Sequence, residues 1–280
     1  MDVILLGTGS PIPSATRAGP ATLVRAGAEN LLVDCGRGVI MRLTGAGLSP
    51  PMITAVLLTH MHSDHICDLN DVITSHWIMA PGPIPLKIFG PSGAKALVDA
   101  TLAMLRFDVK YRTDHHADLN DPPRVEVTEL QPGDEFEVGD CRISAHRTDH
   151  SPVFPTLGYR IERAGVVAAL AGDTIPCAEL DEMCRGADIY VQTVIRDDLV
   201  KMVPSPRLQD ILDYHSTVEQ AGQTAQRAGV GTLMLTHYVP PLFPGQEDAW
   251  RAIAAGHFSG PIVLGDDLTS VTVPDRQVAG

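Results

Sequence analysis

The seven residues THMHSDH at positions 59–65 constrain this chain more than any other feature. They follow the apolar run ITAVLL at 53–58, which predicts a short buried strand, so the cluster lies where a strand meets its loop. Neutral imidazole and carboxylate are ligands for zinc, iron or manganese, and four of them on one loop exceed what one ion easily accepts. The stretch therefore predicts a site for two metal ions, with a merely histidine-rich polar loop as the alternative. The four ligand candidates are His60, His62, Asp64 and His65.

Short apolar runs alternate with helical segments along the chain, which favours a layered α/β architecture. Strands are expected at 3–6, 30–34, 55–59, 86–90, 125–130, 141–147, 157–162, 166–172, 188–193 and 232–236. Helices are expected at 39–44, 66–79, 94–105, 177–185, 217–228 and 248–255. No Ser/Gly-rich linker or charge block divides the chain, so we expect a single domain over residues 1–280. The runs AVLLTH and TLMLTH end alike at His60 and His237, which predicts two similar half-folds that converge on one site.

Composition and charge exclude several classes of protein. The five cysteines are widely spaced without a C-x-x-C pair, which argues against a disulfide framework or a cysteine-based zinc site. No apolar run approaches the roughly 20 residues of a membrane span, and the start of the chain lacks a signal-peptide pattern. We therefore expect a cytoplasmic protein without a membrane partner. The net charge of -13 argues against general nucleic-acid affinity. The basic run RFDVKYR at 106–112 is interpreted as a solvated face.

The pattern H-x-H-x-D-H after an apolar strand resembles the metal motif of the metallo-β-lactamase superfamily. Further short motifs resemble its ribonuclease Z-like branch in order and spacing, over nearly the whole chain: GTGSP at 7–11, VDCG at 33–36, FGPSG at 89–93, TDHS at 148–151, AGDT at 171–174, YHST at 214–217 and LTHY at 235–238. The resemblance implies a four-layer αβ/βα sandwich built from two similar halves. It also implies a homodimer.

The resemblance further implies a metal-ligand set of seven side chains. One ion is expected on His60, His62 and His150, the second on Asp64, His65 and His237, with Asp173 bridging them. Asp173 also stands out without the resemblance, because an unpaired acid at a buried strand end is costly. His146 is the rival of His150, which the TDHS match favours. We expect two divalent ions, zinc in the first place, with manganese or iron as alternatives.

Two residues have expected catalytic roles. Asp64 is expected to orient the nucleophilic hydroxide or carry its proton. His215 precedes SxxE at 216–219, a capping-box pattern that opens a helix, and the resemblance implies that it protonates the leaving oxygen. The alternative for His215 is a histidine that only caps its helix.

Two departures from ribonuclease Z bear on the substrate. The long arm that grips tRNA, between the positions of His150 and Asp173, is absent, and VQTVI at 191–195 lacks the glutamate that would orient His215. Together with the charge of -13 they favour a phosphodiesterase for a small substrate, such as a cyclic nucleotide, over RNA. The alternatives are a tRNA 3′-processing endoribonuclease and an arylsulfatase-, esterase- or lactonase-like hydrolase. A non-enzymatic metal-binding scaffold comes last, because all seven ligands are present.

The remaining signals have structural interpretations. His76 is expected to pack against the core, and His115 and His116 to lie in a solvated loop, with lining of the pocket as the alternative for all three. Asp34 is expected to stabilise the neighbouring loop. Four loops are expected around the pocket, at 12–17, 76–85, 107–119 and 238–245.

Overall fold

The computed structural model describes residues 1–276, whose strands form two seven-stranded sheets. The first sheet has the order β14-β1-β2-β3-β4-β5-β6 and the second the order β13-β12-β11-β10-β9-β8-β7. The strands of the first sheet are β1 (Asp2–Gly7), β2 (Ala21–Ala26), β3 (Glu29–Val33), β4 (Ala55–Leu57), β5 (Leu86–Pro91), β6 (Val125–Leu130) and β14 (Ser270–Thr272). Those of the second are β7 (Glu135–Val138), β8 (Cys141–Arg147), β9 (Leu157–Arg163), β10 (Val166–Leu170), β11 (Ile189–Ile195), β12 (Thr232–Val239) and β13 (Ile262–Val263).

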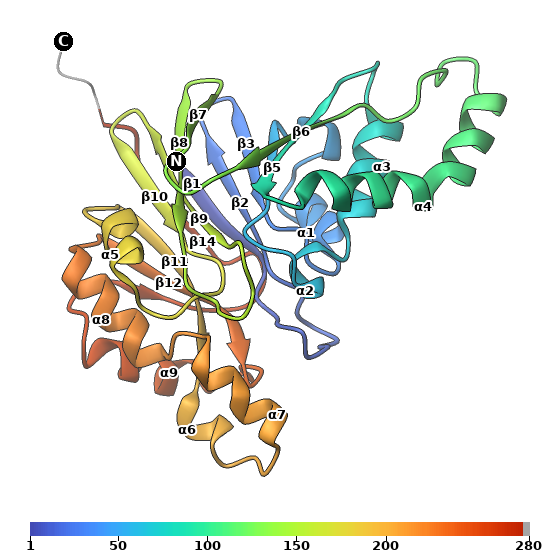
Figure 1. The fold of residues 1–280 in the computed structure, drawn as a ribbon. Helices are drawn as coiled ribbons and strands as arrows, with labels where there is room; N and C mark the ends of the chain where they lie inside the picture. The colour runs from blue at the N-terminus through green and yellow to red at the C-terminus, as the bar shows by residue number, and fades with distance from the viewer. Residues whose placement is uncertain (277–280) are drawn as a thin grey trace.

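Helices cover the outer face of each sheet (Figure 1). The first sheet is covered by helices from the first half of the chain: α1 (Val39–Gly45), η1 (Pro50–Met52), α2 (Ser63–Ile66), α3 (Leu69–Met79) and α4 (Ala94–His115). The second sheet is covered by α5 (Ala178–Cys184), α8 (Val218–Ala228) and α9 (Glu247–Ala255). Between β11 and α8 lie three short helices: α6 (Asp197–Val200), α7 (Pro206–Gln209) and η2 (Asp210–Asp213). The expected four-layer αβ/βα sandwich is confirmed.

The unbroken apolar runs of the sequence are explained by burial of both sheet faces. On β1, Val3 and Leu5 pack between the two sheets, whereas Ile4 and Leu6 pack against the helices outside. Side chains alternate between the faces of a strand, so a strand covered on both sides needs apolar residues at every position. Within residues 1–276, no helix combines the length and apolar character that a membrane crossing requires.

All ten expected strands are present, and four others were missed. The missed strands are β2, β7, β13 and β14; the last two have only 2 and 3 residues, too few for a pattern to be read. The helix expected at 66–79 is two helices, α2 and α3, and α4 continues to His115 instead of ending at 105. The basic run 106–112 lies on the projecting half of α4, where Lys110 and Arg112 pair with acids four residues away along the helix.

The two Thr-His runs lie in the two sheets, as the half-fold prediction requires. His60 lies three residues beyond the end of β4. His237, however, lies inside β12, which continues to Val239, so its expected place at a strand end is wrong. The residue has a left-handed φ of 55°, and the pairing of β11 with β12 shifts register at this point. Such an irregularity changes the direction of a side chain without ending the strand.

Candidate metal centre

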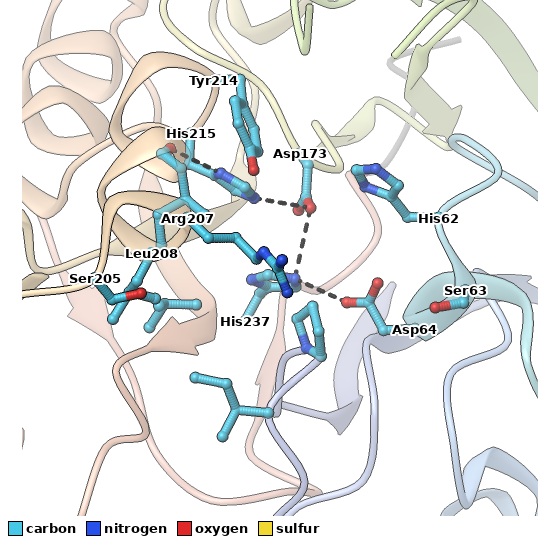
Figure 2. A pocket seen from close by; sticks show the side chains of 14 residues that line it. His62, Ser63, Asp64, Asp173, Ser205, Arg207, Leu208, Tyr214, His215 and His237 are labelled. Carbon is cyan, nitrogen blue, oxygen red and sulfur yellow. Dashed lines mark hydrogen bonds and ion pairs between the residues drawn. The ribbon is translucent and has the colours of Figure 1, made fainter. Parts of the chain in front are cut away.

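The expected ligands gather at one end of the sandwich, from four separate places in the chain. His60 and His62 lie in the loop after β4, and Asp64 and His65 on α2. The others come from the second half of the chain: His150 follows β8, Asp173 follows β10, and His237 lies in β12. All are buried except His62, which is half-buried. Figure 2 shows part of this cluster at the wall of a pocket.

The first group consists of His60, His62, His150 and Asp173, whose ligand atoms all lie within 4.8 Å of one another. His150 Nε2 is 3.1 Å from His62 Nδ1. Asp173 Oδ2 is 3.9 Å from both His60 Nε2 and His150 Nε2. Ligands that bind one tetrahedral ion at 2.0–2.1 Å lie about 3.4 Å apart, so these separations suit a shared cation.

The second group consists of Asp64, His65 and His237. Asp64 Oδ2 is 3.2 Å from His237 Nε2 and 3.6 Å from His65 Nε2. Asp173 Oδ2, the same oxygen that faces the first group, is 3.4 Å from His65 Nε2 and 3.5 Å from His237 Nε2. Asp173 therefore lies between the two groups, where a bridging carboxylate would have to be.

Several atoms of these side chains are buried without a hydrogen-bond partner among the described residues. They are His60 Nε2, His65 Nε2 and Asp173 Oδ1. A buried polar atom without a partner is costly, and native proteins rarely leave several together. Cations would satisfy all three, so the residues present fit a dinuclear centre.

The Nδ1 atoms of His65 and His150 are held by neighbours. Asp34 Oδ2 lies 2.7 Å from His65 Nδ1, and the Asp34 carboxylate also accepts hydrogen bonds from the amide and hydroxyl of Thr59, each 2.8 Å long. His150 Nδ1 lies 2.7 Å from the carbonyl oxygen of Tyr214. Such contacts fix the tautomer and leave Nε2 free for a metal.

Asp34 supports the loop as expected, but its contact with His65 was missed. No local pattern in the sequence shows this contact, because it depends on how two strands pair. β3 and β4 run parallel with Val33 opposite Leu57, so Asp34 lies beside the loop that follows β4.

The protonation states of the first group of side chains also suit metal binding. Burial lowers the pKa of His60 well below its usual value and that of His150 to about 4, so both are neutral, the form that binds metals. Burial alone would raise the pKa of Asp173, but the surrounding histidines, His237 and His65 first, hold it well below its usual range. Asp173 is therefore an anion between the two groups.

His215 lies at the same end of the sandwich, directly before α8. Its Nε2 is 3.3 Å from Asp173 Oδ2, and its Nδ1 lies 3.1 Å from the carbonyl oxygen of Ile211. The expected capping box at 216–219 is wrong by one residue, because Thr217 and Gln220 form it. The hydroxyl of Ser216 donates instead to the carbonyl of Thr174. His215 therefore does not cap α8, and it faces the cluster.

The other expected residues lie away from the centre. His146 bonds Ser144 within β8, and His76 is buried in α3. His115 and His116 are exposed where α4 ends. None of these histidines lines the pocket of about 410 Å³ beside the cluster.

The pocket is walled by a segment that the sequence did not indicate. Of the four expected loops, only 12–17 and 238–245 contribute, through Ile12 and Val239. The opposite wall comes from α7, η2 and the residues around them, including Leu208 and Ile211. We call residues 196–214 the wall segment. Its apolar residues pack as a small separate cluster against the ends of β11 and β12. A polar stretch with one-turn helices gives no periodic signal, which is why it was missed.

Comparison with known proteins gives one consistent result. The Beta-lactamase superfamily domain matches residues 29–238. A protein named Ribonuclease Z from Mycolicibacterium paratuberculosis is 55% identical over 275 residues, which cover 98% of each chain. In structure, the metallo-β-lactamase fold protein YhfI from Bacillus subtilis has a TM-score of 0.73 at 23% identity, over 96% of this chain and 98% of that one. The short form of human tRNase Z has a TM-score of 0.71 at 22% identity, over 98% and 100%.

Proposed function

The chain belongs to the ribonuclease Z family of the metallo-β-lactamase superfamily and is a metal-dependent hydrolase, and from this we propose that it removes the 3′ trailer of tRNA precursors. The observation that carries the proposal is the identity of 52–55% to ribonucleases Z over nearly the whole length of both chains. The cluster of seven expected ligands supports it, since a pair of metal ions there would activate water and polarise a phosphodiester.

The expectation of a small phosphodiester as substrate, with RNA disfavoured, is wrong. It gave weight to the absent arm, yet the relative of 55% identity aligns over 98% of its length and so has no room for a long arm either. It also gave weight to the net charge of -13. Net charge acts at long range, whereas an RNA phosphate at the centre meets the local field of the metal ions.

We propose that the seven expected side chains are the ligands of two ions, zinc in the first place. One ion is assigned to His60, His62 and His150, the other to Asp64, His65 and His237, with Asp173 shared between them. When bound, the ions lower the pKa of a water molecule and polarise the phosphodiester. The tautomers fixed through Asp34 and Tyr214 support this assignment.

Two side chains would move protons in the reaction. Asp64, 3.2 Å from His237 Nε2, would take the proton of the attacking water. His215 would protonate the leaving 3′ oxygen from Nε2, because its Nδ1–H is directed to the carbonyl of Ile211. The Ile211 carbonyl would orient the His215 ring, which is the role of the glutamate that the segment 191–195 lacks.

The test is cleavage of a 3′-extended tRNA precursor by the zinc-reconstituted protein, beside 3′,5′-cyclic AMP. We expect release of the trailer and little turnover of the cyclic nucleotide. Asp64→Ala should abolish cleavage, whereas Asp71→Ala, which removes an exposed acid of α3, should not. No precursor cleavage by fully metal-loaded protein would contradict the proposal.

Three expectations remain predictions: a single domain over residues 1–280, a homodimer, and a cytoplasmic location, where a tRNA precursor would be met. Sedimentation at several protein concentrations measures the second.

A further inference from the structure

The pocket beside the metal centre contains one strongly basic side chain, Arg207 of α7. No other lysine or arginine among the residues 1–276 that the structure describes lines this pocket. Figure 2 shows the Arg207 side chain reaching from the wall segment across the pocket toward His237. The residue is exposed and lines the pocket, so its charge is available to a substrate there.

Arg207 also differs from the other basic residues of the wall segment. Arg196 and Lys201 are each paired with a nearby acid, Asp198 and Asp197, at 2.6 and 2.7 Å. Arg207 has no acidic partner within the described part of the chain. An arginine that is not neutralised in place keeps its full attraction for an anionic ligand.

A second hollow, which adjoins the first at Tyr214, has the opposite charge. It has a volume of about 420 Å³ and shares His62 and Tyr214 with the first pocket. Its charged side chains are Asp210 and Asp213, which follow Arg207 in the wall segment. Two routes therefore lead to the metal centre, one past a cation and one past two carboxylates. A polyanion is attracted along the first and repelled from the second.

We propose that Arg207 is a positioning residue that holds the phosphate next to the scissile one, so that the RNA backbone follows the pocket of Ile12 and Leu208 and avoids Asp210. The inference rests on the proposed function and adds the route of the substrate. Guanidinium matches phosphate through two parallel hydrogen bonds, which fixes both position and orientation. The scissile phosphate itself belongs to the metal centre, whose cations already compensate its charge.

The experiment compares two substrates that differ in their number of phosphates. For a 3′-extended tRNA precursor, Arg207→Ala should raise KM roughly 10- to 100-fold and change kcat far less. For bis(4-nitrophenyl) phosphate, which has a single phosphate, the loss in kcat/KM should be at least about tenfold smaller. The slope of log KM against log salt on the precursor should fall by about 0.7, as expected when one contact to a single-stranded phosphate is lost.

Two further variants separate this role from a structural one. Arg207→Lys keeps the charge without the paired hydrogen bonds, so it should keep the salt slope and recover part of the affinity. Lys201→Ala removes the same charge from the same segment outside the pocket, and it should leave KM and the salt slope near wild-type values.

An unchanged KM and salt slope for Arg207→Ala on the precursor would overturn this inference alone. Equal losses on both substrates would also overturn it, because they would place Arg207 on the scissile phosphate. If the wild-type protein cleaved no precursor, the proposed function would fail, and this inference with it.

Discussion

The metal centre and the wall segment lie side by side, yet they are built in opposite ways. At the centre, all the proposed ligands except His62 are buried, and Asp34 and Tyr214 hold the Nδ1 atoms of His65 and His150. The wall segment consists of one-turn helices, and most of its residues from 201 to 210 are exposed. Catalysis requires atoms fixed within a fraction of an ångström, whereas a substrate wall needs only the right shape and charge. The difference agrees with the two proposals, which give the chemistry to the centre and the positioning of the substrate to the wall segment.

The largest effect should come from the carboxylate between the two ligand groups. Asp173→Ala removes the shared ligand, so both ions should be lost and precursor cleavage should fall by at least about 10³-fold. Metal content by mass spectrometry and single-turnover cleavage measure the two effects. A variant that kept two ions per chain would show that Asp173 is not shared, and the bridging assignment would have to be abandoned.

The next largest effect is expected for His215, which follows the wall segment and faces the proposed ligands. His215→Ala should lower kcat on the precursor by about 10²–10⁴-fold, because it removes the proposed proton donor. Metal content should stay at the wild-type level, since His215 is outside the seven assigned ligands. If His215→Ala kept full turnover, His215 would have no catalytic role and would only pack against its neighbours.

The Asp34→Ala variant tests whether a side chain that holds a proposed ligand in place affects metal binding. Asp34→Ala removes the partner of His65 Nδ1 and of the Thr59 backbone, and it should weaken metal affinity by about 10- to 100-fold. Titration of metal-free protein with zinc against a competing chelator gives the affinity. As a matched control, Asp68→Ala removes a neighbouring acid that bonds the Gly38 amide instead of a ligand. If both variants lost metal affinity equally, the loss would come from removing any acid in this region and not from the contact between Asp34 and His65.

The smallest effect belongs to the start of α8, just beyond the wall segment. Thr217→Ala removes the capping box that Thr217 forms with Gln220, and it should lower the free energy of unfolding by about 1 kcal/mol. Urea denaturation measures the change, and Thr217→Ser, which keeps the hydroxyl, serves as the control. A loss of cleavage far beyond this small destabilisation would mean that the cap also positions His215.

The sequence predicted the parts of the molecule that local patterns encode. Three strands that lead into the site, β4, β10 and β12, were found because burial on both faces requires nearly unbroken apolar runs. The wall segment was missed, since its short exposed helices have no hydrophobic period. The substrate was misjudged for a related reason: a net charge averages over the chain, and it does not show that Arg207 and Asp210 line two different hollows.

By itself the sequence determined that the chain is a metal-dependent hydrolase, because the types and the spacing of the proposed ligands His60, His62, Asp64 and His65 are properties of one short loop. The tertiary structure alone decided how distant residues complete that loop. It placed one oxygen of Asp173 between two ligand groups, brought Asp34 to His65, and turned Arg207 toward the pocket. These arrangements depend on which strand ends meet when the two sheets pack. Contacts between residues far apart in the chain leave no local pattern in the sequence, so only the tertiary structure shows them.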